Sequence, residues 1–259
     1  MAQKLPLSVA IITFNEELKI GATLKSISDI ASEIIIIDSH STDETVYISS
    51  NYTDKIFIED WKGHVTQKNS ALSKCTQKWI LCLDADEVVT EKLKESIIKK
   101  ITNPNYDGYL INRKTFYLDK LMNHAWQPDW NLRLVKSTSD PKWEGLDPHD
   151  FLTIKGKTSK IIGNLIHYSY NGISHHFYKT IDYAKISAKS YLDAGKKFRV
   201  INLIINPLFA FFRLFVLRKG IFDGTRGFIA AFSSFFGTFM KYIFLWDLER
   251  NIRDKTKNI

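Results

Sequence analysis

Alternation of buried-strand and helical patterns over the first hundred residues most limits what this chain can fold into. Short β-branched apolar runs at 7–13, 33–38, 55–59 and 79–83 are typical of strands that are covered on both faces. Helical spacing of apolar residues appears between them at 16–30, 41–50 and 66–75, and again at 90–101. Repeated strand–helix–strand order predicts a parallel sheet with right-handed crossovers.

Polar residues follow three of these strands at the point where each strand ends. They are Thr13-Phe14-Asn15-Glu16-Glu17, Asp38-Ser39-His40-Ser41 and Asp84-Ala85-Asp86. The carboxyl ends of parallel strands meet at one edge of the sheet, where ligands bind in such folds. We therefore expect all three groups on one rim.

Asp84 and Asp86 place two carboxylates one residue apart at a strand end. Such a pair can face a divalent cation, Mg²⁺ or Mn²⁺, which in turn binds a diphosphate. The cation would neutralise negative charge that develops on a departing nucleoside diphosphate. By itself an Asp-x-Asp pair is weak evidence, because solvated turns and helix caps produce the same pattern.

The pattern changes near residue 106. Segments 109–113, 132–135 and 151–154 are predicted to be antiparallel strands, and the chain becomes helical again beyond Ser174. Apolar, aromatic-rich stretches at 203–217 and 228–246 follow. The chain thus divides into an α/β part at 1–105, a strand-rich part at 106–175 and a helical part at 176–259.

The strand-end strings together resemble the nucleotide-binding half of glycosyltransferase family 2. The strings that carry this resemblance are Ser8 through Glu17, Ile37 through Thr45 and Leu83-Asp84-Ala85-Asp86-Glu87. The family has the GT-A fold, a Rossmann-like mixed sheet flanked by helices. The resemblance implies that 1–105 binds a nucleotide sugar, that 106–175 binds the acceptor, and that 176–259 is an extension that associates with a membrane or oligomerises.

A narrower resemblance is to bacterial lipopolysaccharide core β-1,4-glucosyltransferases. It is carried by later motifs: Gln67-Lys68-Asn69, Pro128-Asp129 with Leu132-Arg133-Leu134, Trp143-Glu144-Gly145 leading to His149-Asp150, His167-Tyr168-Ser169-Tyr170, and Phe222 through Phe228. The resemblance covers nearly the whole chain. It implies an inverting transfer of glucose or another hexose, with UDP-glucose as the expected donor, to a lipid-linked saccharide such as lipopolysaccharide core.

The resemblance also assigns a donor-binding set. The base and ribose are expected at the first two strand ends, and the ribose or diphosphate near the third strand end, the helix at 66–75 and a later strand. These residues are Thr13, Asn15, Glu17, Asp38, Ser39, Gln67, Lys68, Asp84, Ala85 and Arg133. Lys68 as a solvated helix lysine and Arg133 as a solvent-facing strand arginine remain alternatives.

An inverting transfer needs a carboxylate that takes the proton of the acceptor hydroxyl. Asp150 stands where related sequences carry the glutamate of a His-Glu pair, so it is one methylene shorter, and it is the favoured candidate. Asp129 is the second candidate. His149 would orient the base or contact phosphate, although a packing or capping histidine is nearly as common.

Charge and cysteine content bear on location. The chain has 36 basic and 28 acidic residues, and much of the excess flanks the apolar C-terminal stretches. That placement favours an anionic membrane surface over nucleic acid. The two cysteines, Cys75 and Cys82, are expected to be reduced, and no secretory signal opens the chain. We expect a cytoplasmic protein that is peripheral on the inner face of the bacterial cytoplasmic membrane. A helical pair that packs on the catalytic part, or forms a homo-oligomer, is the alternative.

Two other functions use similar features. A nucleotidyltransferase acting on sugar phosphates would also combine a metal with a nucleotide, but it predicts a glycine-rich loop after the first strand, where this chain has Thr13-Phe14-Asn15-Glu16-Glu17. A non-catalytic membrane adaptor would not need Asp84, Asp86 and Asp150 together.

Overall fold

The computed structural model describes residues 4–146 and 149–257, and the chain forms two compact units. Unit 1 consists of Met1–Lys114 and Asp129–Tyr168, and unit 2 consists of Thr115–Pro128 and Ser169–Ile259. Residues 115–128 thus belong with the C-terminal helices rather than with the strands on either side of them. The sequence pattern at 106–175 had given no sign of this grouping.

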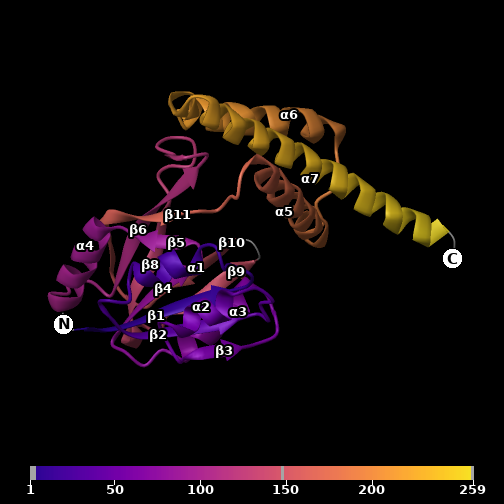
Figure 1. The fold of residues 1–259 in the computed structure, drawn as a ribbon. Helices are drawn as coiled ribbons and strands as arrows, with labels where there is room; N and C mark the ends of the chain where they lie inside the picture. Colours follow the sequence, from indigo (N-terminus) through magenta and orange to yellow (C-terminus); the bar gives the residue numbers. More distant parts are fainter. Residues whose placement is uncertain (1–3, 147–148, 258–259) are drawn as a thin grey trace. The chain divides into compact units, whose positions relative to one another are not determined.

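A mixed sheet forms the centre of unit 1 (Figure 1). Its strands follow the order β3-β2-β1-β4-β8-β6-β11-β5. The first four pair in parallel, and β8 joins β4 and β6 in antiparallel fashion. Their bounds are β1 (Leu5–Thr13), β2 (Ala31–Asp38), β3 (Ile56–Ile58), β4 (Trp79–Asp84), β5 (Glu87–Val89), β6 (Gly108–Tyr117), β8 (Trp130–Lys136) and β11 (Thr158–His167). The parallel half therefore brings the ends of β1, β2 and β4 to one edge.

Both faces of β1 are covered, as its apolar run predicts. Leu7, Val9 and Ile11 point into a core that also holds residues of α1 (Ile20–Lys25) and α4 (Glu91–Thr102). Ala10 points to the opposite core, which includes residues of α3 (His64–Ser73) and of the hairpin β9 (Lys142–Leu146) and β10 (His149–Thr153). The hairpin is thereby fixed on the same face as α3.

Two predicted helices are shorter than expected. The segment predicted at 16–30 contains only α1, and that at 41–50 contains only α2 (Thr45–Ser50). Neither Ser41 nor Thr42 caps α2, because Glu44 is the residue before its first turn. The preceding residues instead exchange side-chain hydrogen bonds with the loop after β1, which competes with helix formation.

Unit 2 is built on helices. They are α5 (Ile173–Asp193), α6 (Val200–Phe212) continued by the π-helical turn η2 (Arg213–Leu217), the short 3₁₀ helix η3 (Gly220–Asp223) and the long α7 (Thr225–Lys257). The longest of them, α7, packs against both α5 and α6 (Figure 1). Strand β7 (Lys120–Leu121) pairs with the end of β6.

Asp223 fastens the 115–128 segment to this helical unit. Its carboxylate accepts hydrogen bonds from the backbone N–H groups of Asn123, His124 and Ala125 at 2.8–3.1 Å. Three residues later, Arg226 Nε donates to the Leu118 carbonyl at 2.6 Å. The Phe222-to-Phe228 motif therefore holds unit 2 together. The predicted α/β class, with a mixed sheet flanked by helices and a helical C-terminal extension, is confirmed.

Candidate active site

Asn15 and Glu17 join the loop after β1 to the loop after β2. The Asn15 amide oxygen accepts a hydrogen bond from Thr42 N at 2.9 Å, and the Glu17 carboxylate accepts one from Glu44 N at 3.0 Å. In return, Asp43 accepts from Glu17 N at 3.1 Å. The polar groups expected to meet a nucleoside thus hold two strand-end loops in one arrangement.

Asp38 and Gln67 lie deep at the neighbouring strand end. Asp38 is fully buried and accepts from the backbone N–H of Ser41 at 2.8 Å. The Gln67 side chain, from α3, donates to Ser39 Oγ at 3.2 Å and is 1% exposed. Thr13, also buried, has a hydroxyl with no hydrogen-bond partner among the described residues.

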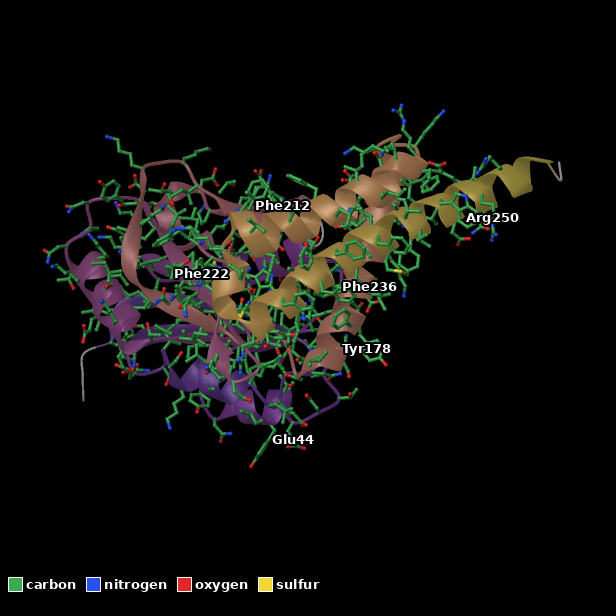
Figure 2. The ribbon with its side chains drawn as sticks, turned by 90° about the horizontal axis from the view of Figure 1, so that it is seen from above. Glu44, Tyr178, Phe212, Phe222, Phe236 and Arg250 are labelled. Carbon is green, nitrogen blue, oxygen red and sulfur yellow. The ribbon has the colours of Figure 1, made fainter. Side chains whose placement is uncertain are left out.

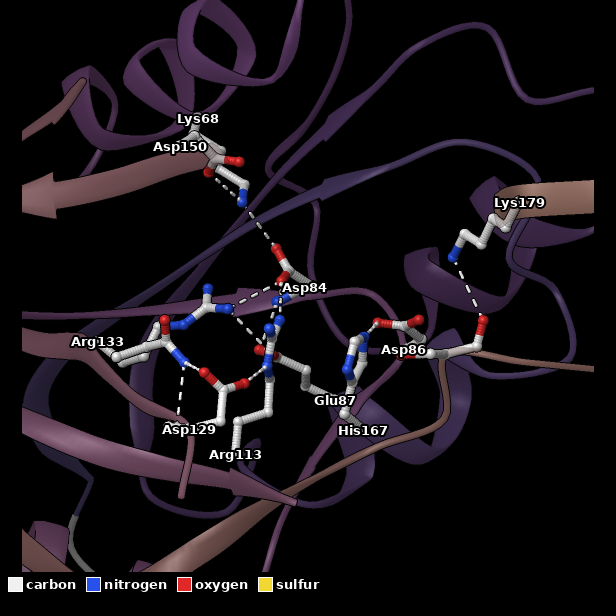
Figure 3. Close-up of polar contacts among 12 residues, drawn as sticks. Lys68, Asp84, Asp86, Glu87, Arg113, Asp129, Arg133, Asp150, His167 and Lys179 are labelled. Atoms are coloured by element: carbon white, nitrogen blue, oxygen red, sulfur yellow. Dashed lines mark hydrogen bonds and ion pairs between the residues drawn. The ribbon is translucent and has the colours of Figure 1, made fainter. Parts of the chain in front are cut away.

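The Asp84 carboxylate is surrounded by positive charge (Figure 3). Arg133 Nη2 lies 2.9 Å from Oδ2, Lys68 Nζ lies 3.1 Å from Oδ1, and Arg113 Nη1 lies 3.8 Å from Oδ2. Burial raises the pKa of Asp84, but Arg133 and Lys68 outweigh it and hold the pKa well below its usual range. Asp84 is therefore ionised at neutral pH.

Lys68 connects Asp84 to the candidate base. Its Nζ donates to Asp150 Oδ2 at 2.7 Å and lies 4.4 Å from the centre of the Trp143 ring. Burial lowers the pKa of Lys68, yet the negative charges of Asp84 and Asp150 reverse that effect and raise it. A single, largely covered ammonium group thus bridges a carboxylate of β4 and a carboxylate of β10.

Asp86 points away from these cations and faces His167 (Figure 3). His167 Nε2, at the end of β11, lies 3.3 Å from Asp86 Oδ1. Burial raises the pKa of Asp86, and the contact with His167 more than offsets that and lowers it. Of these two groups, the carboxylate is the kind of ligand that Mg²⁺ and Mn²⁺ prefer.

The possible metal ligands here fit a cation that a substrate phosphate would help to bind. They do not fit a cation that is held by protein side chains alone. Within 4–146 and 149–257, no group of three or more His, Cys, Asp or Glu side chains is arranged to hold a metal ion. Magnesium sites that serve phosphates commonly use one or two carboxylates and leave the other positions to phosphate and water. Asp84 and Asp86 offer two carboxylates of the kind such a site uses, and in this structure Asp84 faces Lys68 whereas Asp86 faces His167.

Asp129 pairs with Arg113, on another side of the Asp84 network from Lys68. Arg113 Nε donates to Asp129 Oδ2 at 2.8 Å, and Asn131 donates to its other oxygen at 2.9 Å. The same Arg113 lies 3.6 Å from the fully buried Glu87, whose pKa is raised by burial. Asp129 is therefore held by an arginine that lies 3.8 Å from Asp84, whereas Asp150 is held by the lysine that lies 3.1 Å from Asp84.

Arg133 is almost entirely buried and only partly satisfied. Its Nη2 donates to Asp84 and to Glu87, each at 2.9 Å, and the two acids raise its pKa although burial opposes them. Its Nε and Nη1 atoms have no hydrogen-bond partner in the described part of the chain. Buried donors without acceptors are costly, so they favour binding of an oxygen-rich, anionic group.

The structure brings several predicted residues into direct contact. Lys68, Asp84, Arg133 and Asp150 form one continuous network, while Asn15, Glu17, Asp38, Ser39 and Gln67 brace the strand ends beside it. Ala85 is buried, and its carbonyl accepts from the Thr23 hydroxyl at 2.8 Å. The side chain of His149 lies outside the described residues.

Sequence reasoning missed three charged or titratable residues here. Glu87 and His167 stood inside quoted motifs but were given no role, and Arg113 closed a predicted strand. The one sequence feature that could have pointed to any of the three is that Glu87 directly follows Asp84-Ala85-Asp86. The pairing of Asp86 with His167 joins residues 81 positions apart, which requires knowing that β11 lies beside β5.

Comparison with known proteins identifies relatives of this chain. The sequence model of the family described as Glycosyl transferase family 2 matches residues 8–162. The lipopolysaccharide core biosynthesis glycosyltransferase LpsC of Rhizobium meliloti is 30% identical over 244 residues, covering 89% of this chain and 88% of LpsC. An uncharacterised glycosyltransferase of Rickettsia typhi is 29% identical, covering 96% of this chain and 89% of the relative.

A solved structure shares the fold. TarS 1–349 of S. aureus, crystallised in complex with UDP-GlcNAc, aligns with a TM-score of 0.51 and 13% sequence identity. The alignment covers 90% of this chain and 90% of that one. At this level of identity the likeness concerns the architecture alone, a mixed sheet flanked by helices.

Proposed function

Because this chain belongs to glycosyl transferase family 2, we propose that it is a metal-dependent, inverting hexosyltransferase that uses a UDP-sugar such as UDP-glucose. The acceptor is a lipid-linked saccharide of the lipopolysaccharide core type, met at the inner face of the cytoplasmic membrane. The observation that carries the proposal is the position of Lys68, within 3.1 Å of Asp84 and 2.7 Å of Asp150. The acidic strand end and the candidate base are thereby adjacent.

Donor binding uses the residues at the strand ends. The braced loops after β1 and β2 receive the base and ribose, and the unsatisfied Arg133 nitrogens and the Lys68 ammonium group attract the diphosphate. Asp84, Asp86 and His167 would hold Mg²⁺ or Mn²⁺, which when bound would balance charge on the leaving diphosphate. Lys68 and Arg133 supply the positive charge that attracts the diphosphate, and neutral side chains in their place would not.

Asp150 then acts on the acceptor. Its carboxylate accepts the proton of the acceptor hydroxyl as that oxygen forms its bond to the anomeric carbon, and the bond to the diphosphate oxygen breaks on the opposite face. Configuration at the anomeric carbon is inverted as a result. Lys68 pairs with Asp150 before the substrates arrive and, drawn toward the diphosphate, leaves an Asp150 oxygen open to the hydroxyl.

Calorimetric titration and product analysis test the proposal. UDP and UDP-glucose should bind in the presence of Mn²⁺, and binding should be lost with a chelator or in Asp86→Ala, because the diphosphate loses its cationic bridge. Asp54→Ala, which removes an exposed carboxylate on a loop, is the matched control and should bind normally. Full transfer activity of the wild-type protein in chelator would contradict the metal requirement, and an α-linked product from UDP-glucose would contradict inversion.

A further inference from the structure

The outward face of α6 is apolar where a helix of a water-surrounded protein is normally polar. Its exposed side chains recur at helical spacing: Ile201, Ile204, Ile205, Leu208, Phe209 and Phe212, followed by Val216 in η2. Ile204 is 55% exposed and Leu208 is 58% exposed. Phe212 marks the position of this face on α6 in Figure 2. We call these seven residues the α6 face.

The opposite side of α6 is already used. Pro207, Ala210 and Leu214 are buried, and Asn206 donates a hydrogen bond to the Tyr242 hydroxyl of α7 at 2.6 Å. The inner side is therefore fixed on α7, and the α6 face cannot rotate inward to be covered. An apolar stripe of this length without cover is a docking surface.

Charge around the α6 face identifies its partner. Between Asp193 and Asp223 the sequence has six basic residues and no acidic one. Lys196, Lys197 and Arg199 precede the helix, Arg218 and Lys219 follow it, and Arg213 stands beside the face. Apolar side chains bounded by cations match a surface of anionic headgroups above acyl chains.

The same charges oppose pairing with a second copy. In a two-fold symmetric contact, an antiparallel arrangement would set Lys197 against the partner's Arg218, and a parallel one would set equivalent cations against each other. Both arrangements bring positive charge onto positive charge across an apolar contact, which is unfavourable. An anionic bilayer places negatively charged headgroups beside the basic residues at both ends of α6.

Packing within unit 2 favours a helix that lies along the bilayer surface. By length and composition, Val200–Leu217 and Thr225–Arg253 are each long and apolar enough to cross a membrane. However, α7 also packs along α5, whose outer surface exposes Asp182, Lys185 and Lys189. If these helices spanned the membrane, the charged side chains would enter the hydrocarbon core. Charged side chains at the bilayer centre are energetically costly and therefore rare.

We propose that the α6 face docks this protein on an anionic lipid bilayer, with α6 parallel to the surface, its apolar residues among the upper acyl chains and its flanking cations among the headgroups. The docking surface is centred on α6 and η2, whose exposed apolar residues recur at helical spacing. The proposal concerns attachment and is independent of the chemistry at Asp84 and Asp150.

Co-sedimentation of the full chain with vesicles, without nucleotide or metal, tests the docking. The protein should bind phosphatidylcholine vesicles that contain phosphatidylglycerol, bind much less to phosphatidylcholine alone, and lose binding as salt is added. Ile204→Gln with Ile205→Gln should weaken binding about tenfold or more, because two exposed apolar side chains are lost from the contact. The matched control is Ile58→Gln with Ile162→Gln, two exposed isoleucines of unit 1 that should leave binding unchanged.

A second pair of variants isolates the charge. Lys197→Glu with Arg199→Glu should weaken binding to anionic vesicles about tenfold or more. Lys92→Glu with Lys99→Glu, the same charge change on α4, should not. Asp86→Ala should bind as the wild type does, which separates docking from donor binding. Equal binding to neutral and anionic vesicles, or a lipid-free dimer that the Ile204/Ile205 variant abolishes, would overturn the proposal.

Discussion

Lys68 makes two carboxylates depend on the same positive charge. Asp84 and Asp150 come from sequence segments that lie far apart, and each contacts Lys68 Nζ at hydrogen-bonding distance. If the diphosphate binds near Asp84 as proposed, it competes with both for this ammonium group, since ion pairs in a site of low dielectric constant are strong. Donor binding therefore changes the surroundings of Asp150 before any acceptor is present.

Replacement of the base should separate turnover from donor affinity. Asp150→Asn should lower the rate of transfer by about 100-fold or more, a typical contribution of a general base. Donor affinity should not fall, because Lys68 retains Asp84 and no longer has the Asp150 charge as a competitor of the diphosphate. Steady-state kinetics with both substrates, together with donor titration, gives the two quantities.

Asp129→Asn is the matched control for this measurement. It removes the same charge from a carboxylate in the same unit, but one that pairs with Arg113 rather than Lys68. We expect a smaller loss of turnover. The assignment of the base to Asp150 is wrong if Asp129→Asn shows the 100-fold loss and Asp150→Asn does not.

At the scale of elements, Gly227 sets how closely α7 approaches η3. A Cβ atom at Gly227 would lie 1.8 Å from the Gly220 carbonyl oxygen and 3.1 Å from Asp223 Cβ. Both obstacles belong to η3, and the nearer is backbone, so no side-chain rotation relieves the overlap. Larger side chains at this position must displace η3 and, with it, the hydrogen bonds of Asp223.

Gly227→Ala should therefore destabilise the protein by roughly 2 kcal/mol or more, the range seen when a packed contact is overfilled. Thermal unfolding followed by circular dichroism measures the effect. Gly21→Ala in α1 is the control, because its added Cβ meets its nearest neighbour at an ordinary 3.4 Å, and alanine favours helix over glycine. A midpoint for Gly227→Ala equal to that of Gly21→Ala would contradict the argument.

Elements that are apolar on both faces were predictable from sequence, and those set by distant partners were not. The strands β1, β2 and β4 followed from β-branched runs, and α4 followed from apolar spacing. The structure adds that the Thr90 hydroxyl caps α4. The start of α2 was misplaced because Asn15 draws Thr42 out of helical conformation. Strands β5, β9 and β11 were missed because their pattern is short or interrupted.

The same distinction holds within the candidate site. Asp84 and Asp86 were found because a strand end and a spacing of two are local features. Their different orientations, Asp84 toward Lys68 and Asp86 toward His167, depend on which strands pair. Strand pairing cannot be inferred from the local sequence. The contacts of His167 and Arg113 were therefore identified only in the structure.

At the scale of the whole molecule, the chain passes between its two units three times, after Lys114, Pro128 and Tyr168. Unit 2 consequently draws its core from both sides of Asp129–Tyr168. Tyr117 and His176 meet in that core, with Tyr117 Oη and His176 Nδ1 at 2.8 Å. His176 is 2% exposed, and burial lowers its pKa from 6.5 to about 4.

This buried histidine predicts an acid sensitivity with a defined window. Above pH 6.5 it is neutral in both the folded and the unfolded chain, so it adds no pH dependence. As the pH falls from 6.5 toward about 4, the unfolded chain binds a proton that the folded chain does not, and the free energy of unfolding decreases. The total loss should reach up to about 3 kcal/mol.

Urea unfolding at neutral pH and at about pH 5 measures this loss from tryptophan fluorescence. His176→Asn keeps a polar partner for Tyr117 but cannot titrate, so its stability should change less between the two pH values. His40→Asn, at an exposed site beside Asp60, should behave as the wild type does. Equal pH dependence in all three proteins would exclude His176 as the cause.

The division of unit 2 along the sequence also affects how the chain leaves the ribosome. Asn123 is synthesised 100 positions before Asp223, the residue that holds it. At roughly 5–20 residues per second, the 115–128 segment waits on the order of 5–20 seconds for its partner. During that interval Tyr117, Met122 and Ala125 lack the helical residues that bury them. The nascent chain thus presents an apolar segment to chaperones until α7 has emerged.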